Sequence, residues 1–277
     1  MLTLTRKITF TAGHIYRGGG LSREQLEAIF GVAAEPSGHG HNYVLEVSVR
    51  GPVNPLDGMV VNIKDVDAQL KSILAEVDHR MINTAMPEFF DAVPTTEKLA
   101  QALWNRLPKS IGAAQYIALR LEEHPGLHVE LSGDSPHMVQ LTRSIEFAAS
   151  HRLHTEKLSP DENRRIYGKC NNPNGHGHNY VVEVTVSGEP DPRSGIVIDL
   201  GLLEKLLEDQ IEARFDHKHL NLDTTYFNDK AATAENIAIV IWDLLKDRIP
   251  ACRSGGAVKL HRVRLIETAR SWFDYYG

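Results

Sequence analysis

The stretch GHGHNY occupies Gly38–Tyr43 and returns unchanged at Gly175–Tyr180, 137 residues further along the chain. Three further pairs of segments repeat in the same order, 137 or 138 residues apart: Phe10–His14 with Phe147–His151, Gly58–Asn62 with Gly195–Asp199, and Thr95–Glu97 with Thr233–Glu235. Ordered repetition on this scale indicates a tandem duplication of one domain. We therefore predict two domains, residues 1–133 and 138–277, joined at the turn-forming segment SGDSPH at Ser132–His137.

The composition is that of an ordinary globular chain. Its 277 residues suit two domains, and a hydrophobic fraction of 42% with a charged fraction of 24% excludes disordered, collagen-like and coiled-coil proteins. A net charge of −6 argues against a general nucleic-acid-binding surface. We find neither an apolar run of about 18 residues nor a secretory leader. The two cysteines provide no disulfide framework, so we expect a cytoplasmic protein without nucleic-acid or membrane partners.

Each half has the pattern of strands, then helices, then strands. Apolar side chains alternate over residues 43–49 and again over 180–186, which predicts half-buried antiparallel strands. Helical spacing of apolar residues predicts four helices, at Val66–Leu74, at Leu99–Leu107, at Leu200–Ile211, and over 237–245 with Thr233 as the cap. A late strand around Val263–Leu265 is expected to pair with Trp272–Tyr276. This ββααββ order predicts an α+β fold with helices on one face of the sheet.

Histidines form the most informative cluster. His176 and His178 flank a glycine, and on a strand two such side chains point to the same face. His151 lies 25 residues upstream, where antiparallel pairing would bring it beside them. Three imidazoles without a thiolate favour a Zn²⁺ site with an open fourth position. The first half repeats the spacing at His14, His39 and His41, so we predict one Zn²⁺ per domain and up to two per chain.

Three further groups could carry chemistry in the second half. Cys170 lies in the loop CNNPNG before His176, where a nearby cation could hold it as a thiolate, although a free cysteine is more often a packed small apolar residue. Asp216 could orient the imidazole of His217 and raise its basicity. Glu267 on the late strand could accept two N–H groups of a guanidine-like ligand, or could simply be solvated.

The second half resembles the 6-pyruvoyl-tetrahydropterin synthase family. The resemblance rests on SHRLHTEKLSPDENRRIYGKCNNPNGHGHNYVVEVTVSGEPDP, continued by GIVIDL, DHKHLN, TAEN and VRLIET, and covers most of residues 143–268. The first half looks like a diverged copy of the same family. The resemblance implies the tunnelling fold, a ββααββ unit whose antiparallel sheets join between subunits into barrels. It also implies a homo-oligomer with pockets formed between subunits.

The resemblance implies a zinc-dependent carbon–oxygen lyase acting on 7,8-dihydroneopterin triphosphate. The residues that match the family's functional positions are the zinc ligands His151, His176 and His178, the general base Cys170 with the assisting pair Asp216 and His217, the pterin anchor Glu267, and the pocket residues Thr233 and Glu235. Elimination of triphosphate and an internal redox tautomerisation would give 6-pyruvoyl-tetrahydropterin without a redox cofactor. Cations for the triphosphate could come from Arg152, Lys157, Arg164 and Lys169, for which ordinary surface charge is an equal explanation.

The first half departs from this pattern at the base. Ala33 stands where the second half has Cys170, and Asn62 stands where it has Asp199. The interpretation we favour is that the first half keeps zinc, has lost turnover and supports the assembly. In the alternative, Glu35 replaces the thiolate as base and cleaves the pterin side chain to a 6-hydroxymethyl product.

Two other functions remain open at this point. The 6-carboxytetrahydropterin synthases of the queuosine pathway resemble this chain, but they typically have three residues between the cysteine and the first histidine of HGH. Five residues separate Cys170 from His176, which favours the pyruvoyl branch. A pterin-binding or scaffold role without turnover is the non-enzymatic alternative, and it is more plausible for the first half than for the second.

Overall fold

The computed structural model describes residues 1–253 and 257–277, which divide into two compact units. The first unit comprises Met1–Leu141, Ser187–Gly201 and Arg253–Val258, and the second comprises Thr142–Val186, Leu202–Cys252 and Lys259–Gly277. Two segments of the second sequence half therefore belong to the first unit. The domain bounds inferred from the repeat, 1–133 and 138–277, stay a prediction. Within the described residues, no helix has the length and apolar character needed to cross a membrane.

The first unit is built on an antiparallel sheet. Its strands are β1 (Leu2–His14), β2 (His39–Gly51), β5 (Ala114–His124) and β6 (Leu127–Ser132), in the spatial order β6-β5-β2-β1. The short strand β3 (Arg80–Met81) runs parallel to β1, and β4 (Ser110–Ile111) pairs with β5. Alternate residues of β2, from Tyr43 to Val49, are at most 1% exposed, as expected for a strand with one face on the core.

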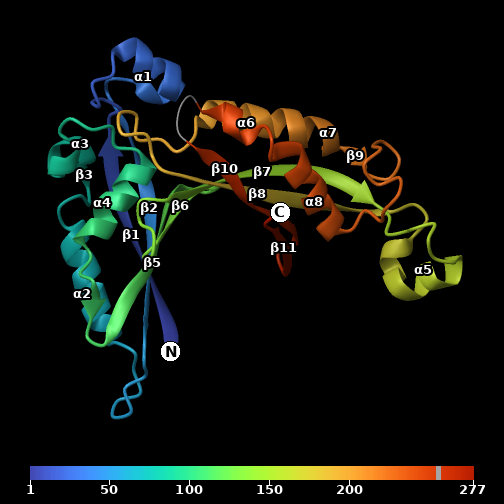
Figure 1. Ribbon diagram of the computed structural model, residues 1–277, viewed down its shortest axis with the longest axis horizontal. Helices are drawn as coiled ribbons and strands as arrows, with labels where there is room; N and C mark the ends of the chain where they lie inside the picture. Colours follow the sequence, from blue (N-terminus) through green and yellow to red (C-terminus); the bar gives the residue numbers. More distant parts are fainter. Residues whose placement is uncertain (254–256) are drawn as a thin grey trace. The chain divides into compact units, whose positions relative to one another are not determined.

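Helices cover one face of this sheet. Figure 1 shows α2 (Ile63–Leu74), α3 (Ile82–Ala85) and α4 (Thr96–Arg106) on one side of β1, β2 and β5. Helix α2 begins at the N-cap Asn62, and helix α4 at the N-cap Thr95. A short 3₁₀ helix, η2 (Pro87–Phe89), lies between α3 and α4. The apolar residues of α2 and α4 face the strands, so the core of the unit lies between helices and sheet.

The second unit repeats this plan. Its strands β7 (Val139–His151), β8 (His176–Gly188), β10 (Val258–Thr268) and β11 (Ser271–Tyr275) follow the order β11-β10-β8-β7. The short strand β9 (Lys218–His219) is parallel to β7. Its helices are α6 (Leu200–Leu207), α7 (Ala213–Phe215) and α8 (Ala234–Leu245), followed by the 3₁₀ helix η5 (Ile249–Cys252). Figure 1 shows α6 and α7 along β7 and β8, and α8 contacts β11.

The structure confirms the α+β fold with two tandem copies of one antiparallel unit. The predicted pair of late strands is present, with Leu265 opposite Phe273. Thr233 caps α8 by accepting a hydrogen bond from the backbone of Asn236. Assembly of the sheets into barrels stays a prediction.

The helix predicted at Leu200–Ile211 is interrupted. After α6 the chain forms a π-helical turn, η4 (Glu208–Glu212), before α7 begins. A π turn accommodates one residue more than an α turn. The repeat distance changes from 137 to 138 residues between Gly195–Asp199 and Asp216, so we infer that the extra residue of the second copy is absorbed here.

Besides the short helices α3 and α7, sequence analysis missed one helix of eight residues in each unit. Helix α1 (Arg23–Phe30) leads into the 3₁₀ helix η1 (Gly31–Ala34), and α5 (Pro160–Tyr167) leads into η3 (Gly168–Asn171). Both helices begin with a capping box, built by Ser22 with Gln25 in the first and by Ser159 with Glu162 in the second. A Ser followed three residues later by Gln or Glu is a known start signal and could have revealed them.

Candidate active site

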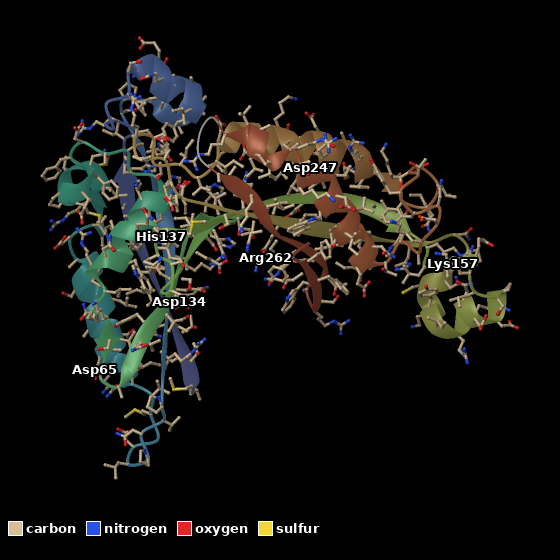
Figure 2. The ribbon with its side chains drawn as sticks, viewed as in Figure 1. Asp65, Asp134, His137, Lys157, Asp247 and Arg262 are labelled. Carbon is tan, nitrogen blue, oxygen red and sulfur yellow. The ribbon has the colours of Figure 1, made fainter. Side chains whose placement is uncertain are left out.

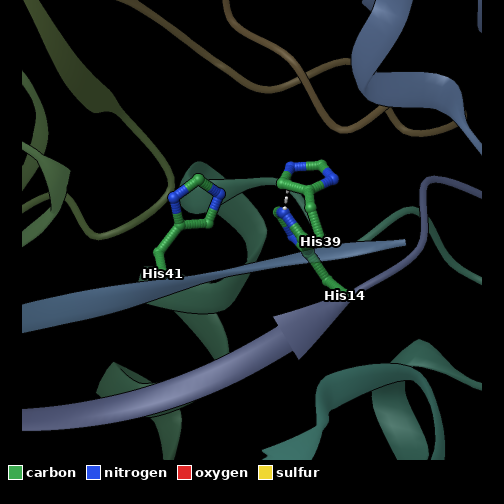
Figure 3. A group of neighbouring side chains, drawn as sticks. All are labelled: His14, His39 and His41. Atoms are coloured by element: carbon green, nitrogen blue, oxygen red, sulfur yellow. Dashed lines mark hydrogen bonds between the residues drawn. The ribbon is translucent and has the colours of Figure 1, made fainter. Parts of the chain in front are cut away.

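The first-half histidines meet at one end of β1 and β2. His14 is the last residue of β1 and pairs with His39, the first residue of β2, while His41 follows two residues later on the same face. The Nε2 atoms of His14 and His39 lie 2.9 Å apart, and one ring nitrogen from each of the three side chains falls within 4.8 Å of the others. Figure 3 shows the three rings gathered beside these strands.

The second-half histidines repeat the arrangement. His151 ends β7, and His176 and His178 begin β8. The Nε2 atoms of His151 and His176 are 3.2 Å apart, and the three side chains again bring a ring nitrogen within 4.8 Å of one another. The structure therefore brings together both histidine sets that the sequence predicted.

Both clusters fit a divalent cation. The Nδ1–H groups of His14 and His151 donate to the carbonyls of Pro94 (3.0 Å) and Ala232 (2.7 Å), which leaves each Nε2 lone pair facing the cluster. Burial lowers the pKa of both rings to about 4, so they are neutral near pH 7 and able to ligate. A third observation is that the buried Nε2 atoms of His41 and His178 find no hydrogen-bond partner among the described residues.

A glutamate lies beside each cluster. Glu267 of β10 places Oε1 3.8 Å from Nε2 of His178 and 3.9 Å from Nε2 of His151. Glu123 of β5 places Oε1 3.5 Å from Nε2 of His41. The hydroxyl of Thr96 donates to the other oxygen of Glu123, whereas Ala234 occupies the matching position in the second half. The Glu267 carboxylate is accordingly more open, with 21% of its side chain exposed against 7% for Glu123.

The pair Asp216 and His217 is ordered by the backbone. Nδ1–H of His217 donates to Asp216 at 2.6 Å, and Asp216 also accepts a 2.8 Å hydrogen bond from the backbone N–H of Ala148. These hydrogen bonds, that from Ala148 first, lower the pKa of Asp216. His217 has a left-handed backbone (φ 54°), which is uncommon for a residue other than glycine. Asp78 and His79 repeat the pair at 2.9 Å, with φ 58° at His79.

A cavity of about 530 Å³ in the second unit is lined by one residue of the Asp216–His217 pair and by one residue of the histidine cluster. Both His217 and His178 line it, together with Ala148, Ala149, Ser150, Gly177, Asn179, Lys218 and His219. The exposed ring of His217 therefore faces the same open space as one member of the histidine cluster. A small polar substrate in this cavity could reach both.

The thiol position differs between the halves. Cys170 lies partly exposed in η3, which is held by a 2.9 Å hydrogen bond from the backbone of Leu153 to the carbonyl of Cys170. It is outside the group of donor atoms that could share a metal. Ala33 takes its place in η1, and Glu35, just after η1, is exposed.

The remaining predicted site residues are more scattered. Thr233 is the cap of α8, and Glu235 in its first turn is exposed. Among the predicted cations, Arg152 donates to the carbonyl of Asn171 at 3.2 Å and Arg164 pairs with Asp161. Lys157 is exposed beside α5 (Figure 2). These contacts show no common binding point for a triphosphate among these side chains.

Sequence analysis missed two aromatic residues near the clusters. The hydroxyl of Tyr180 lies 3.3 Å from Nδ1 of His151, and its pKa is raised by burial and by the charges of Glu267 and Cys170. Tyr16 stacks on Phe30 and also contacts the ring of His14. Tyr180 ends the repeated GHGHNY motif, so its repetition could have signalled a place near the site.

These features define a duplicated α+β protein with a candidate three-histidine metal site in each copy. The sequence profile described as "6-pyruvoyl tetrahydropterin synthase" matches residues 3–134 and again residues 140–277. The chain therefore belongs to the 6-pyruvoyl tetrahydropterin synthase family, as its sequence motifs suggested.

Three similar proteins each match half of this chain or less. The 6-pyruvoyl tetrahydrobiopterin synthase of Homo sapiens is 47% identical over 138 residues, which are 50% of this chain and 91% of that protein. The 6-carboxy-5,6,7,8-tetrahydropterin synthase of Rickettsia typhi is 32% identical over 117 residues, covering 37% of this chain and 76% of that protein. The solved 6-pyruvoyl tetrahydropterin synthase of Caenorhabditis elegans is 41% identical, with a TM-score of 0.46, and covers 50% of this chain and 96% of that one.

Proposed function

We propose that this chain is a zinc-dependent carbon–oxygen lyase that converts 7,8-dihydroneopterin triphosphate to 6-pyruvoyl-tetrahydropterin and triphosphate. The second half would carry the reaction. The observation that supports this most is the cavity lined by both His178 and His217, because it places one member of the three-histidine cluster near the oriented Asp216–His217 pair. Similarity to named pterin synthases supports the substrate class.

In the proposed mechanism, His151, His176 and His178 would hold Zn²⁺ through ring nitrogens, and the metal, when bound, would supply Lewis-acid chemistry. Cys170 accepts a proton from the side chain of the substrate. Asp216 fixes the tautomer of His217, so that Nε2 of that ring is free to exchange a proton in the cavity.

The same proposal assigns recognition of the pterin to Glu267. Its carboxylate would accept N–H groups of the ring beside the cluster. Thr233 and Glu235 would complete the wall of the pocket. Triphosphate leaves by elimination, and hydrogens then rearrange within the product, so no external redox cofactor is required.

For the first half we propose a metal-holding copy without turnover. Its histidines, its glutamate and its Asp78–His79 pair are in place, but Ala33 offers no base. In the alternative, Glu35 acts as the base. The Glu35 side chain is exposed in this chain and would have to reach the substrate. We further propose that the protein works in the cytoplasm as a homo-oligomer.

Product identification tests this proposal. Zinc-loaded protein would be incubated anaerobically with 7,8-dihydroneopterin triphosphate and the products separated by liquid chromatography with mass spectrometry. We expect 6-pyruvoyl-tetrahydropterin and free triphosphate from the unaltered chain and from the control Cys252→Ala, and neither from Cys170→Ala. A 6-carboxy product would overturn the assignment in favour of the other branch. A 6-hydroxymethyl product that survives Cys170→Ala and disappears with Glu35→Ala would move the chemistry to the first half.

A further inference from the structure

The cavity beside His217 in the second unit has two kinds of wall. One is built from small residues at the end of β7 and the start of β8, namely Ala148, Ala149, Ser150 and Gly177. The other is basic and consists of His217 with Lys218 and His219 of β9, the strand that runs parallel to the end of β7 (Figure 1). The cavity volume of about 530 Å³ lies within the usual range of small-molecule sites, roughly 300–1,000 Å³. The cavity therefore has room for a ligand next to basic side chains.

Three polar side chains of this cavity have unused hydrogen-bond donors. Among the described residues, the hydroxyl of Ser150, the carboxamide of Asn179 and the ammonium of Lys218 have no hydrogen-bond or ion-pair partner. Nδ1 of His219 is buried and also finds no partner in the described part of the chain. A buried polar atom without a partner calls for a ligand or an ordered water. The cavity thus offers several polar groups that the protein itself does not satisfy.

The charge around the cavity favours an anion. None of its nine lining residues is acidic. Two carboxylates next to it are already engaged: Asp216 accepts hydrogen bonds from His217 and from the backbone of Ala148, and Asp223 accepts one from the backbone N–H of His219 at 2.7 Å. An ammonium group with neighbouring neutral donors binds phosphate oxygens through charge-assisted hydrogen bonds.

The first copy closes the same place with a side chain of its own. Thr11 stands where the second copy has Ala148, and the Thr11 hydroxyl donates to Oδ1 of Asn42 at 3.1 Å. Asn179 is the counterpart of Asn42, and Ala148 offers it no such donor. The alanine of the second copy therefore leaves a carboxamide without that partner and leaves the volume of part of a side chain open.

A second difference sets a basic side chain against an apolar one. Met81 is the counterpart of His219, and its Sδ lies over Gly13, 2.5 Å from where a Cβ would stand. In the second copy Ser150 takes the place of Gly13, and Nε2 of His219 lies against Gly175, 2.8 Å from the position of a Cβ. The space that a thioether covers in the first copy is therefore bordered by a hydroxyl and an imidazole in the second.

We propose that this cavity binds the triphosphate group of a small-molecule substrate. Lys218 supplies the positive charge, and Ser150 and Asn179 donate to phosphate oxygens. Nε2 of His217 donates as well when the ring is protonated, because Asp216 already holds its Nδ1–H. Identifying the anion as the triphosphate of the pterin substrate rests on the proposed function, whereas binding of inorganic triphosphate does not.

The assignment differs from the cations that sequence proximity predicted. None of those four side chains lines this cavity: Arg152, Lys157, Arg164 and Lys169. Lys218 belongs to the short strand β9, more than 60 residues after Arg152 in the chain, and parallel pairing with β7 brings it to Ala149. One lining residue, His178, belongs to the histidine cluster, so an anion held here would lie next to the candidate metal site.

Isothermal titration calorimetry with inorganic triphosphate tests the site on the full, zinc-loaded chain in a buffer without free divalent cations. Lys218→Met removes the proposed charge, and Lys259→Met removes the same charge from an exposed position of β10 as the control. We expect Lys218→Met to raise the dissociation constant by at least about tenfold, as for the loss of a charged hydrogen bond, and Lys259→Met to change it by less than about twofold.

Exchanging residues between the copies tests the shape of the cavity. Ala148→Thr and His219→Met each introduce the residue that the first copy holds at the matching position. We expect each to raise the dissociation constant for inorganic triphosphate by at least about threefold, and both together to raise it further. Thermal unfolding by circular dichroism checks that these variants fold.

His151→Ala separates binding in the cavity from binding to the metal. Affinity that persists in His151→Ala and falls in Lys218→Met supports the proposal. Affinity that is lost in His151→Ala and unchanged in Lys218→Met would place the anion on the metal and overturn the proposal, as would an unaltered chain that binds no triphosphate.

Competition identifies the source of the anion. In Cys170→Ala, we expect 7,8-dihydroneopterin triphosphate to displace inorganic triphosphate, and free 7,8-dihydroneopterin not to displace it. A pterin triphosphate that fails to compete would show that the cavity binds a separate anion and would overturn its assignment to the substrate. A chain that binds inorganic triphosphate through Lys218 but never releases it from the pterin would support the anion site and refute the lyase.

Discussion

The histidine clusters of the two halves are nearly the same, whereas the side chains around them differ. Each cluster is built from the end of one strand and the start of the next, with a backbone carbonyl fixing the most buried ring. Around the first cluster Glu123 is closed in by Thr96 and the thiol position holds Ala33; around the second, Glu267 is more open and Cys170 is present. The comparison teaches that duplication retained the candidate metal donors and altered the groups that would act on a substrate in the proposed reaction.

Replacing the thiol tests this comparison most severely. We expect Cys170→Ala to lower the rate of triphosphate release by about 10²–10⁴-fold, since that is the usual contribution of a positioned base. Adding Ala33→Cys to this variant should restore only a small part of the rate, because Thr96 closes in Glu123 in the first half. The rates would be measured as release of triphosphate under anaerobic conditions. Full recovery would show that the first half lacks only the thiol.

Removing one histidine from each cluster separates metal binding from turnover. We expect His151→Ala and His14→Ala each to reduce bound zinc from two ions to one per chain, with affinity at the altered site down by at least about 100-fold. Only His151→Ala should abolish turnover. Elemental analysis of dialysed protein gives the stoichiometry, and the exposed His137→Ala serves as control. One zinc per unaltered chain would contradict the prediction for the first half.

The burial of Glu97 should make the stability of the protein depend on pH. Burial raises the pKa of Glu97 to about 7 from an ordinary value of 4.5, so the folded state keeps a proton that the unfolded chain releases. Its contribution to stability is therefore complete below pH 4.5 and is lost as the pH rises towards 7.

Replacing the carboxyl group of Glu97 with a neutral amide should remove this dependence of stability on pH. Relative to the unaltered chain, Glu97→Gln should gain about 1–3 kcal/mol in the free energy of unfolding at pH 8 and little at pH 4. Glu235→Gln should change neither value. Urea unfolding at both pH values measures the effect, and equal responses of the two variants would show that Glu97 is not buried as described.

The smallest expected effect concerns the hydroxyl of Thr96. Thr96→Ala copies the second-half residue Ala234 into the first half and leaves the buried Glu123 without that donor. We expect a loss of about 1–2 kcal/mol in unfolding free energy, as for other buried hydrogen bonds. The exposed Thr84→Ala should change it by less than about 0.5 kcal/mol. Thermal unfolding monitored by circular dichroism compares the two.

Local pattern predicted much of the fold. The apolar alternation over 43–49 and 180–186 identified β2 and β8, and the cap at Thr233 identified the start of α8. The helices α1 and α5 were missed because they are short and bury little, with Leu26 the one buried residue described in α1 and Asn163 the one in α5. Without an apolar stripe, a helix is visible in sequence only through its caps.

The site was predictable as far as backbone geometry fixes it. Side chains two residues apart on a strand point to the same face of the sheet. Antiparallel pairing places the end of one strand beside the start of the next. These rules bring His151 to His176 and His178 without knowledge of the rest of the chain. The same rule places Tyr180 on the face of His176 and His178, beside His151. The hydrogen bond from Ala148 to Asp216 joins segments that are distant in sequence and could not be read in this way.

The sequence by itself therefore determined the duplication, through its repeated motifs, and most of the strands, the longer helices and the histidine clusters, through periodicities of 2 and 3.6 residues. Only the tertiary structure decided which of two matching glutamates is buried. Glu97 and Glu235 occupy the same place in nearly the same local sequence, yet Val197, 100 residues further along the chain, covers Glu97, while Glu235 is exposed. Burial depends on what packs over a side chain, and that neighbour is set by the fold of distant segments rather than by the residue's own surroundings in sequence.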